Sequence, residues 1–212
     1  MTAYKTGPKL YEGKAKVLYA VEGNDNLVIQ SFKNSLTAFN GEKKGDFAGK
    51  GELNRNITSL IFRYLGQQGI SSHWVEDVGE VEMVTKKLNI IPLEVVMRNV
   101  AAGSLAKRLG WSEGTELKKP ILEFYYKSDS LGDPMINEDH IAALGCASSE
   151  ELTQLKKAAL LINGELTKLF QQVGFKLIDF KLEFGKDSGG QIILADEITP
   201  DTCRLWDTKT NE

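Results

Sequence analysis

The segment at residues 177–185, LIDFKLEFG, constrains the fold of this 212-residue chain more than any other stretch. Its side chains fall into two sets when read with a period of two, which is typical of a β-strand with two different faces. Charged side chains are seldom crowded onto a half-buried sheet unless they pair or hold an ion. The apolar face comprises Ile178, Phe180, Leu182 and Phe184, and the other face comprises Leu177, Asp179, Lys181 and Glu183.

The chain after this strand carries the signal of a β-hairpin. Gly189 and Gly190 predict a two-residue loop, since a type I′ turn needs positive φ at both central positions. Counting back along the ladder from that loop places Glu183 opposite Asp196, with Cβ atoms roughly 5 Å apart. A register slip of one residue would offer Glu197 instead.

The pair Glu183 and Asp196 is therefore a candidate metal site. Two carboxylates this close repel one another, and the repulsion raises the pKa of one of them unless a cation lies between them. Oxygen ligands with open coordination positions suit Mg²⁺, which typically takes one or two carboxylates together with substrate phosphates. The alternative is a hairpin whose acids are solvated or are bridged by Lys181.

The overall composition is that of an ordinary globular protein. Hydrophobic residues make up 42% and charged residues 26% of a chain long enough for one large domain or two small lobes that share a cleft. The net charge of -3, the pI near 5.6 and the lack of a Lys/Arg block argue against nucleic-acid binding. The N-terminus has no signal peptide and no apolar run is long enough to span a bilayer, so we expect a cytoplasmic protein.

The N-terminal part of the chain predicts an antiparallel β structure, with strands within residues 9–33 and 73–88. The turn between the first two strands contains Gly13, Lys14 and Lys16. Backbone N–H groups and ammonium groups at a hairpin tip predict a cover over phosphate groups. The alternative is an ordinary surface turn, and no Walker A motif occurs.

Two helices are predicted from apolar residues at helical spacing, at 48–65 and 149–173, and a short helix is predicted at about 138–144. Ser148 and Glu151 have the spacing of a capping box at the start of the last helix. We expect the two longer helices to be structural. The apolar stripe of the first helix comprises Leu53, Ile57, Leu60, Ile61, Tyr64 and Leu65.

The segment at residues 90–105, which contains MRNVAAGS, predicts a strand followed by a short helix. Small residues at the start of a helix let backbone N–H groups approach an anion, and Ser104 adds a hydroxyl group. Arg98 supplies a bidentate guanidinium, so the two residues predict a clamp for a phosphate or a carboxylate. The alternative is that Arg98 pairs with Glu94. Arg204, delivered by the turn at residues 199–201, is either a further anion-binding residue or a surface arginine.

The sequence leaves the roles of several polar residues open. The segment 34–41 is either a substrate loop or a simple connection. Lys127 and Asp129 are weak candidates in the irregular loop after the strand near residue 120. Neither His73 nor His140 lies in a nucleophile motif, so we expect both to be surface or structural residues.

Taken together, these motifs resemble the SAICAR synthetase (phosphoribosylaminoimidazole-succinocarboxamide synthase) family. IIPLEVVMRNVAAGS at 90–104 and LIDFKLEFG at 177–185 look like its two signatures, and LYEGKAK and DEITPDTCRLWD agree as well. The resemblance covers nearly the whole chain. Family members continue past the last motif into C-terminal helices, whereas this sequence stops at Glu212.

The resemblance implies an ATP- and Mg²⁺-dependent carbon–nitrogen ligase of purine biosynthesis. Its substrates would be carboxyaminoimidazole ribonucleotide and L-aspartate, with a homodimer or higher homo-oligomer as the assembly. The implied fold is an α+β, two-lobe, ATP-grasp/kinase-like nucleotide-binding architecture. Residues 1–88 would form the antiparallel N-terminal lobe, and residues 89–212 would form a larger mixed C-terminal lobe with the metal and ribonucleotide sites.

The resemblance also assigns roles to matching residues. The ATP-binding set is Gly13, Lys14, Ala15, Lys16, Leu27, Met83, Lys86 and Leu88. The ribonucleotide-binding set is Arg98, Ser104 and Arg204, and the metal ligands are Glu183 and Asp196. Lys181 would offset charge on the transferring phosphoryl group, and Asp179 would orient the ribose or accept a proton.

Two other functions are compatible with such a scaffold. A small-molecule kinase is one, although the protein-kinase motifs HRDxxxxN and DFG do not occur. A non-catalytic nucleotide-binding module is the other, and it predicts that the metal carboxylates are missing or replaced, whereas both are present in this sequence.

Overall fold

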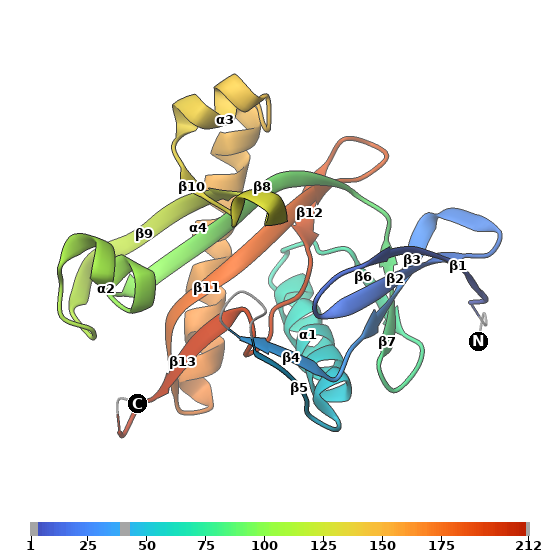
Figure 1. Ribbon diagram of the computed structural model, residues 1–212, viewed down its shortest axis with the longest axis horizontal. Helices are drawn as coiled ribbons and strands as arrows, with labels where there is room; N and C mark the ends of the chain where they lie inside the picture. The colour runs from blue at the N-terminus through green and yellow to red at the C-terminus, as the bar shows by residue number, and fades with distance from the viewer. Residues whose placement is uncertain (1–3, 39–42, 211–212) are drawn as a thin grey trace.

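A computed structural model describes residues 4–38 and 43–210 of the chain. Within these residues the named strands form sheets of five, six and two strands, all with antiparallel pairing, and helices pack against the two larger sheets. The predicted α+β class with antiparallel sheets is thereby confirmed. Figure 1 shows the five-stranded sheet at one end of the molecule and helix α2 at the other.

The five-stranded sheet is built from the N-terminal strands, as the alternation predicts. Val21, Ile29 and Val84 form the small apolar core on one of its faces. Lys16 lies opposite Phe32 in the ladder and therefore shares a face with it, on the other side of the sheet from Ile29. The strand order is β1 (Thr6–Glu12), β2 (Lys16–Val21), β3 (Asn24–Phe32), β7 (Glu82–Lys86) and β6 (Trp74–Asp77).

The six-stranded sheet contains both signature segments side by side. Strands β8 and β11 are neighbours, so the residues of 90–104 and 177–185 face one another across one ladder. The N-terminal part of β11 pairs with β13, and its C-terminal part pairs with β12. The strand order is β10 (Met135–Ile136), β9 (Glu116–Tyr126), β8 (Asn89–Val100), β11 (Phe175–Lys186) and β12 (Ile192–Ala195), with β13 (Cys203–Asp207) beside β11.

The side chains of β11 alternate between two faces as predicted, except at the start of the strand. Phe180, Leu182 and Phe184 are buried in the main core, as predicted. A register shift against β13 between Leu177 and Asp179 interrupts the alternation. Leu177 therefore joins the main core, while Ile178 packs in a separate cluster with Val100 and Ala102.

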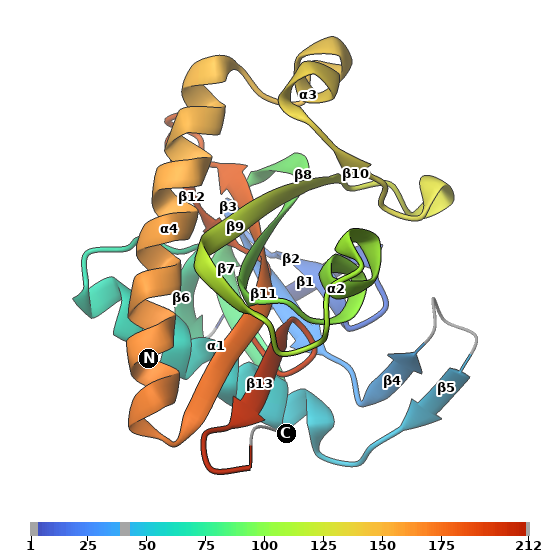
Figure 2. The same cartoon turned by 90° about the vertical axis from the view of Figure 1, so that its left-hand side faces the viewer.

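Helix α4 (Ser149–Gln172) covers one face of the six-stranded sheet, where it contacts β8, β11 and β12. Its predicted capping box is present, with the Ser148 side chain accepting from the backbone N–H of Glu151. Figure 2 shows α4 running along one side of the molecule, with the short helix α3 (Glu138–Leu144) near its N-terminal end. The other short helices are η1 (Asp129–Leu131) and α2 (Gly103–Leu109).

Helix α1 (Lys50–Gln67) packs against the five-stranded sheet and also contributes to the main core. The predicted stripe is partly wrong, because Leu53 and Leu60 are exposed whereas Phe62 is buried. The buried face of α1 contains polar as well as apolar side chains, because the polar side chains form hydrogen bonds to neighbouring segments. Ser59 donates to Asp77, for example.

One short segment joins the two larger sheets. Ser72 forms a parallel bridge with Leu194 of β12, and the backbone N–H of His73 donates to the Leu194 carbonyl at 2.8 Å. The His73 carbonyl in turn accepts from the backbone N–H of Lys86 at 2.7 Å. The strand ends of both sheets are thereby connected through His73.

The β11–β12 hairpin does not have the predicted register. Glu183 lies opposite Ala195 and Lys186 lies opposite Ile192, so Asp196 falls just beyond the ladder. The loop is longer than two residues, because residues 187–191 lie between the last paired residues, Lys186 and Ile192. Within the loop the Asp187 carboxylate accepts from the backbone N–H groups of Gly189 and Gln191. This side-chain cap replaces the type I′ turn that the two glycines predict.

The predicted loop at 34–41 is partly a small hairpin. Strands β4 (Ser35–Ala38) and β5 (Lys43–Asp46) pair with one another, and Figure 2 shows them projecting from the rest of the molecule. Residues 39–41 of the predicted loop lie outside the described residues. Among the helices that the structure describes, none has the length and apolar character needed to cross a membrane.

Candidate active site

Two adjoining cavities collect most of the residues singled out in the sequence. The lysine cavity, of about 390 Å³, lies beneath the β1–β2 hairpin tip and contains Lys16, Lys127 and Lys181. The arginine cavity, of about 260 Å³, is lined by Arg98, Ser104, Tyr125, Asp179 and Thr202, among others. Both cavities are lined by Glu94 and Lys181, so one wall is common to the two.

Lys16 connects the hairpin tip to the acidic residues after β12. Its Nζ atom contacts the carboxylate of Asp196 and lies 2.7 Å from Oε2 of Glu197. Burial alone would lower the pKa of Lys16, but the two carboxylates outweigh burial and raise it. Lys16 is therefore charged.

Lys181 bridges the two predicted metal ligands. Its Nζ atom lies 2.8 Å from Oε1 of Glu183 and 3.2 Å from Oδ2 of Asp196. Burial opposes the charged form of Lys181, but the carboxylates of Asp196, Glu183 and Glu94 raise its pKa well above the ordinary value. Lys127, a weak candidate in the sequence, adds a second ammonium group at 2.6 Å from Oε1 of Glu183.

Glu183 and Asp196 thus reach the same cavity by a route different from the predicted one. They are not directly opposed in the ladder, and the bridge through Lys181 is the alternative that the sequence left open. Asp196 has a φ of 60°, in the left-handed region that few non-glycine residues adopt. This backbone turn lets Asp196 leave the strand and meet Lys16 and Lys181.

The donor set of the lysine cavity is compatible with Mg²⁺. Glu183 and Asp196 offer carboxylate oxygens, the hard ligands that Mg²⁺ takes together with phosphates and water. No group of three or more His, Cys, Asp or Glu side chains with metal-site geometry occurs in the described part of the chain. A magnesium ion here would therefore share its coordination sphere with substrate oxygens.

Burial and charge act in opposite directions on the acids around the lysine cavity. Burial raises the pKa of Glu94 and of Glu197, and Lys181 and Lys16 only partly offset this effect. Burial also disfavours the charged form of Asp196, but Lys16 and Lys181 outweigh it and lower the Asp196 pKa. Asp196 is therefore the anionic partner of both lysines.

Asp179, which lines the arginine cavity, connects Arg98 of that cavity with Arg204. Its Oδ2 atom accepts from NH1 of Arg98 at 2.7 Å and from NH1 of Arg204 at 3.0 Å. Arg98 also donates to Oγ of Ser104 at 3.1 Å. The structure therefore brings together the three predicted ribonucleotide-binding residues. Glu94 contacts Lys181 at 3.4 Å and has no bond to Arg98, so the alternative pairing does not form.

Gly103 allows the close approach of Arg204 to the start of α2. It has a φ of 52°, and a Cβ atom at this position would lie 2.6 Å from NH2 of Arg204. The left-handed backbone conformation favours glycine, and a larger residue would force the Arg204 guanidinium to move.

Three residues of this region were not predicted from the sequence. Glu123 accepts from Arg98 and from Arg108, and Tyr125 donates to Glu123 at 2.9 Å. The spacing of Glu123 and Tyr125, two apart in a predicted strand, is the local signal that could have placed them on one face. Arg108 follows Ser104 by four residues, which is the spacing of neighbours on a helix.

The hairpin tip closes over the lysine cavity by a contact with the η1 segment. Lys14 Nζ lies 2.9 Å from Oδ1 of Asp129, and both side chains are exposed. The tip residues Gly13 and Ala15 line the same cavity. Asp129, a weak candidate in the sequence, therefore belongs to this site.

The predicted adenine-binding residues lie away from both cavities, on the five-stranded sheet and in the segment between β7 and β8. Leu27 pairs with Lys86 across β3 and β7, Met83 is fully buried, and Leu88 contacts Gly185. None of these described residues lines the lysine cavity or the arginine cavity. Their role in binding adenine stays a prediction.

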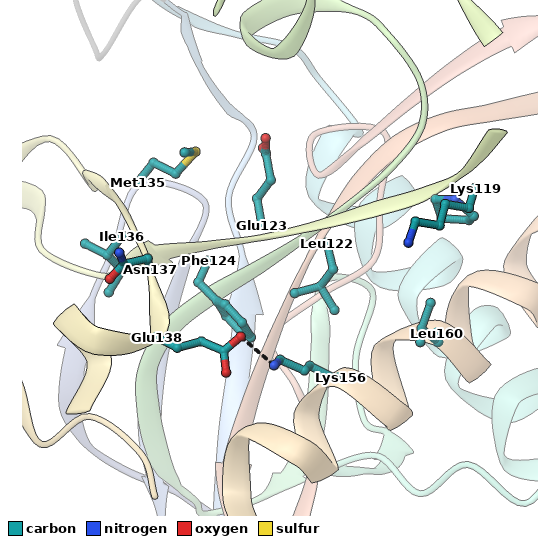
Figure 3. A pocket seen from close by; sticks show the side chains of 11 residues that line it. Lys119, Leu122, Glu123, Phe124, Met135, Ile136, Asn137, Glu138, Lys156 and Leu160 are labelled. Carbon is teal, nitrogen blue, oxygen red and sulfur yellow. Dashed lines mark hydrogen bonds and ion pairs between the residues drawn. The ribbon is translucent and has the colours of Figure 1, made fainter. Parts of the chain in front are cut away.

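A third cavity, of about 510 Å³, lies on the other side of β9, between that strand, β10 and α4 (Figure 3). Leu122, Phe124 and Leu160 give it a mainly apolar lining. An ion pair between Glu138 and Lys156, at 2.6 Å, spans it. It contains no residue predicted to bind a substrate.

Comparisons with known proteins agree with the motifs. A family model described as SAICAR synthetase matches residues 9–212. The protein named phosphoribosylaminoimidazole-succinocarboxamide synthase from Bacillus subtilis (strain 168) is 55% identical over 203 residues, which cover 96% of this chain and 84% of that protein. The protein of the same name from Halalkalibacterium halodurans is 57% identical, with 96% and 85% covered.

Solved structures show the same similarity. A structure described as SAICAR synthetase (Type-2) in complex with ADP superposes with a TM-score of 0.92 at 48% identity, covering 95% of this chain and 85% of that chain. The phosphoribosylaminoimidazole-succinocarboxamide synthase from Ehrlichia chaffeensis superposes with a TM-score of 0.93 at 48% identity, with 97% and 87% covered.

Proposed function

This chain belongs to the SAICAR synthetase family, and we propose that it joins L-aspartate to the carboxylate of carboxyaminoimidazole ribonucleotide. The reaction consumes ATP and releases ADP and phosphate. The observation that carries this proposal is the common wall of the lysine and arginine cavities, formed by Lys181 and Glu94. A phosphate donor in one cavity and a carboxylate acceptor in the other would meet at Lys181.

The chemistry of the reaction explains why several cationic side chains gather at this site. A carboxylate resists attack by an amine because an oxide ion is a poor leaving group. Transfer of the γ-phosphoryl group of ATP to a carboxylate oxygen forms an acyl phosphate and ADP. The amine nitrogen of aspartate then attacks the carbonyl carbon, the C–O bond to phosphate breaks, and the nitrogen loses a proton. All participants are anionic, so positive charge in the site stabilises their approach.

We place ATP in the lysine cavity. The backbone N–H groups at the hairpin tip and the ammonium groups of Lys14 and Lys16 would hold its phosphates. The adenine base would lie against the segment of the five-stranded sheet that leads to the six-stranded sheet. The residues proposed for the base are Leu27, Met83, Lys86 and Leu88.

Glu183 and Asp196 would hold the magnesium ion, which when bound neutralises charge on the nucleotide phosphates. Lys181, already bonded to both acids, would offset charge on the transferring phosphoryl group. Its raised pKa keeps it protonated for this role.

The ribonucleotide would occupy the arginine cavity. Arg98, Ser104 and Arg204 would bind its anionic groups, since guanidinium groups match phosphate and carboxylate geometry. Asp179 accepts from both arginines, which favours an orienting role for this carboxylate over proton transfer.

The division into two lobes also belongs to the proposal. We place the boundary near Leu88, between β7 and β8, with ATP bound between a lobe of residues 1–88 and a lobe of residues 89–212 in an ATP-grasp/kinase-like arrangement. The segment through His73 would hold the lobes together at one end of the cleft. A cytoplasmic location stays a prediction from the sequence, and a homodimer or larger assembly stays a prediction from the family resemblance.

An assay of ADP release tests the proposed function. With ATP, Mg²⁺, L-aspartate and the carboxylated ribonucleotide present, we expect ADP to form, and we expect its formation to stop when either co-substrate is omitted. ADP formation with a hydroxyl acceptor and no aspartate would indicate a small-molecule kinase. Tight ATP binding without turnover would indicate a non-catalytic nucleotide-binding module.

A further inference from the structure

We infer that Glu123 is a positioning residue of the arginine cavity, whose carboxylate holds the guanidinium groups of Arg98 and Arg108 in the orientation that binds the anionic ribonucleotide. This inference rests on the proposed function, because it concerns the same substrate. Glu123 itself does not line the cavity and acts through the arginines.

Three donors converge on the Glu123 carboxylate. Arg98 donates from Nε to Oε2 at 3.0 Å, Tyr125 donates from its hydroxyl to Oε2 at 2.9 Å, and Arg108 donates to Oε1. Only 9% of Glu123 is exposed. A buried carboxylate with two guanidinium partners holds both of them in a defined geometry.

The strand β9 separates this carboxylate from the apolar core. Figure 3 shows the Glu123 side chain on one side of β9 and those of Leu122 and Phe124 on the other. Leu122 and Phe124 line the third cavity. Glu123 also borders that cavity, but its carboxylate faces the arginines. A change at Glu123 that keeps its size therefore leaves the apolar packing of β9 intact.

The partners of Arg98 come from different elements. Its NH1 group donates to Asp179 of β11, and its NH2 group donates to Ser104 of α2 and to the hydroxyl of Tyr125 of β9. Glu123 is the partner of the remaining nitrogen, Nε. Bonds on all three nitrogens fix the plane of the guanidinium, so loss of the Nε contact removes one of the bonds that define its orientation.

The charges of this cluster distinguish a positioning role of Glu123 from simple electrostatic attraction between the cluster and the anionic ribonucleotide. Arg98, Arg108 and Arg204 carry three positive charges, and Asp179 and Glu123 carry two negative ones. Glu123→Gln removes one negative charge and raises the net positive charge of this cluster. If charge alone governed binding, the variant would bind the anionic ribonucleotide more tightly. If Glu123 positions the arginines, it binds the ribonucleotide more weakly.

Steady-state kinetics on the full chain tests this inference. We expect Glu123→Gln to raise the KM for the ribonucleotide about tenfold, while the KM for ATP stays within about twofold of the original value. Glu123→Asp keeps the charge but shortens the side chain, so we expect a smaller rise of about threefold. Glu116→Gln is the matched control, since Glu116 lies on the same strand, is exposed and pairs with the half-buried Lys176. We expect it to change neither KM.

The outcomes separate this inference from the proposed function. If the unmodified protein lacks ADP release dependent on aspartate and the ribonucleotide, the proposed function fails. If that activity is present and Glu123→Gln leaves the ribonucleotide KM unchanged or lowers it, the positioning role is wrong. Equal rises in both KM values would indicate a purely structural role and would also overturn it. Should Glu123→Gln not fold, Glu123→Asp decides, and a ribonucleotide KM equal to that of the original protein rejects the inference.

Discussion

The Nε2 atom of His73 lies 3.0 Å from the backbone carbonyl oxygen of Asp196. Burial, and to a smaller extent the charge of Lys16, lowers the pKa of His73 to about 3, so its ring is neutral near pH 7. A carbonyl oxygen only accepts, so Nε2 carries the ring proton and donates it. His73 therefore stabilises Asp196 in its left-handed conformation and joins it to the five-stranded sheet.

The first prediction concerns this hydrogen bond. His73→Ala removes the donor and leaves a buried carbonyl without it, so we expect a loss of roughly 1–3 kcal/mol in the free energy of unfolding. His73→Gln keeps an N–H donor on a side chain of similar length and should recover most of that loss. Urea unfolding followed by circular dichroism measures both. Equal stabilities of the Ala variant and the original protein would show that the bond contributes nothing.

The second prediction concerns the two acids bridged by Lys181. Glu183→Gln and Asp196→Asn each remove a carboxylate that balances Lys181 and that would hold Mg²⁺. We expect kcat to fall at least about 100-fold in each variant, because stabilisation of the phosphoryl group is lost. Aspartate-dependent ADP release measures the effect. Undiminished turnover in either variant would remove that acid from the metal site.

The third prediction uses the two glycines at the ends of helix α2, Gly103 and Gly110. Gly103 and Gly110 both have positive φ, but only at Gly103 would a Cβ atom meet Arg204. Alanine at either position strains the backbone and is expected to destabilise the protein by about 1 kcal/mol. Only Gly103→Ala displaces Arg204, so only this variant should raise the KM for the ribonucleotide. A similar rise in Gly110→Ala would attribute the effect to helix strain.

The fourth prediction concerns the reactivity of Cys203. Burial raises the pKa of its thiol to about 12, from an ordinary value near 9, with a small further contribution from Asp179. The thiolate is the reactive form, so we expect Cys203 of the folded protein to resist alkylation by iodoacetamide at pH 8. Mass spectrometry of the native and urea-unfolded protein compares the rates. Equal rates in the two states would contradict this prediction.

The same thiol gives a pH dependence with a definite sign. The unfolded thiol ionises near pH 9 and the folded thiol near pH 12. The unfolded state therefore loses its proton first as the pH rises. The stability that the neutral thiol contributes is present below pH 9 and is lost between about pH 9 and 12. Cys203→Ser, compared with the original protein over this range, isolates the contribution.

Local patterns in the sequence determined much of this protein. Alternation predicted β11 and its charged face, and the capping box at Ser148 predicted the start of α4, because these signals depend only on neighbouring residues. The motif at 90–104 placed Arg98 and Ser104 close together for the same reason. Here the bond between the two side chains confirmed the predicted proximity.

Only the tertiary structure decided how distant segments meet. The Asp187 cap shifted the hairpin by one residue, and the positive φ of Asp196 then returned its carboxylate to Lys181. Period-two patterns do not contain this information, since the register depends on loop geometry and on every strand that pairs nearby. Glu123, and the bond of His73 to Asp196, escaped prediction because the partners are distant in sequence. A buried polar group is understood only when the group that satisfies it is seen.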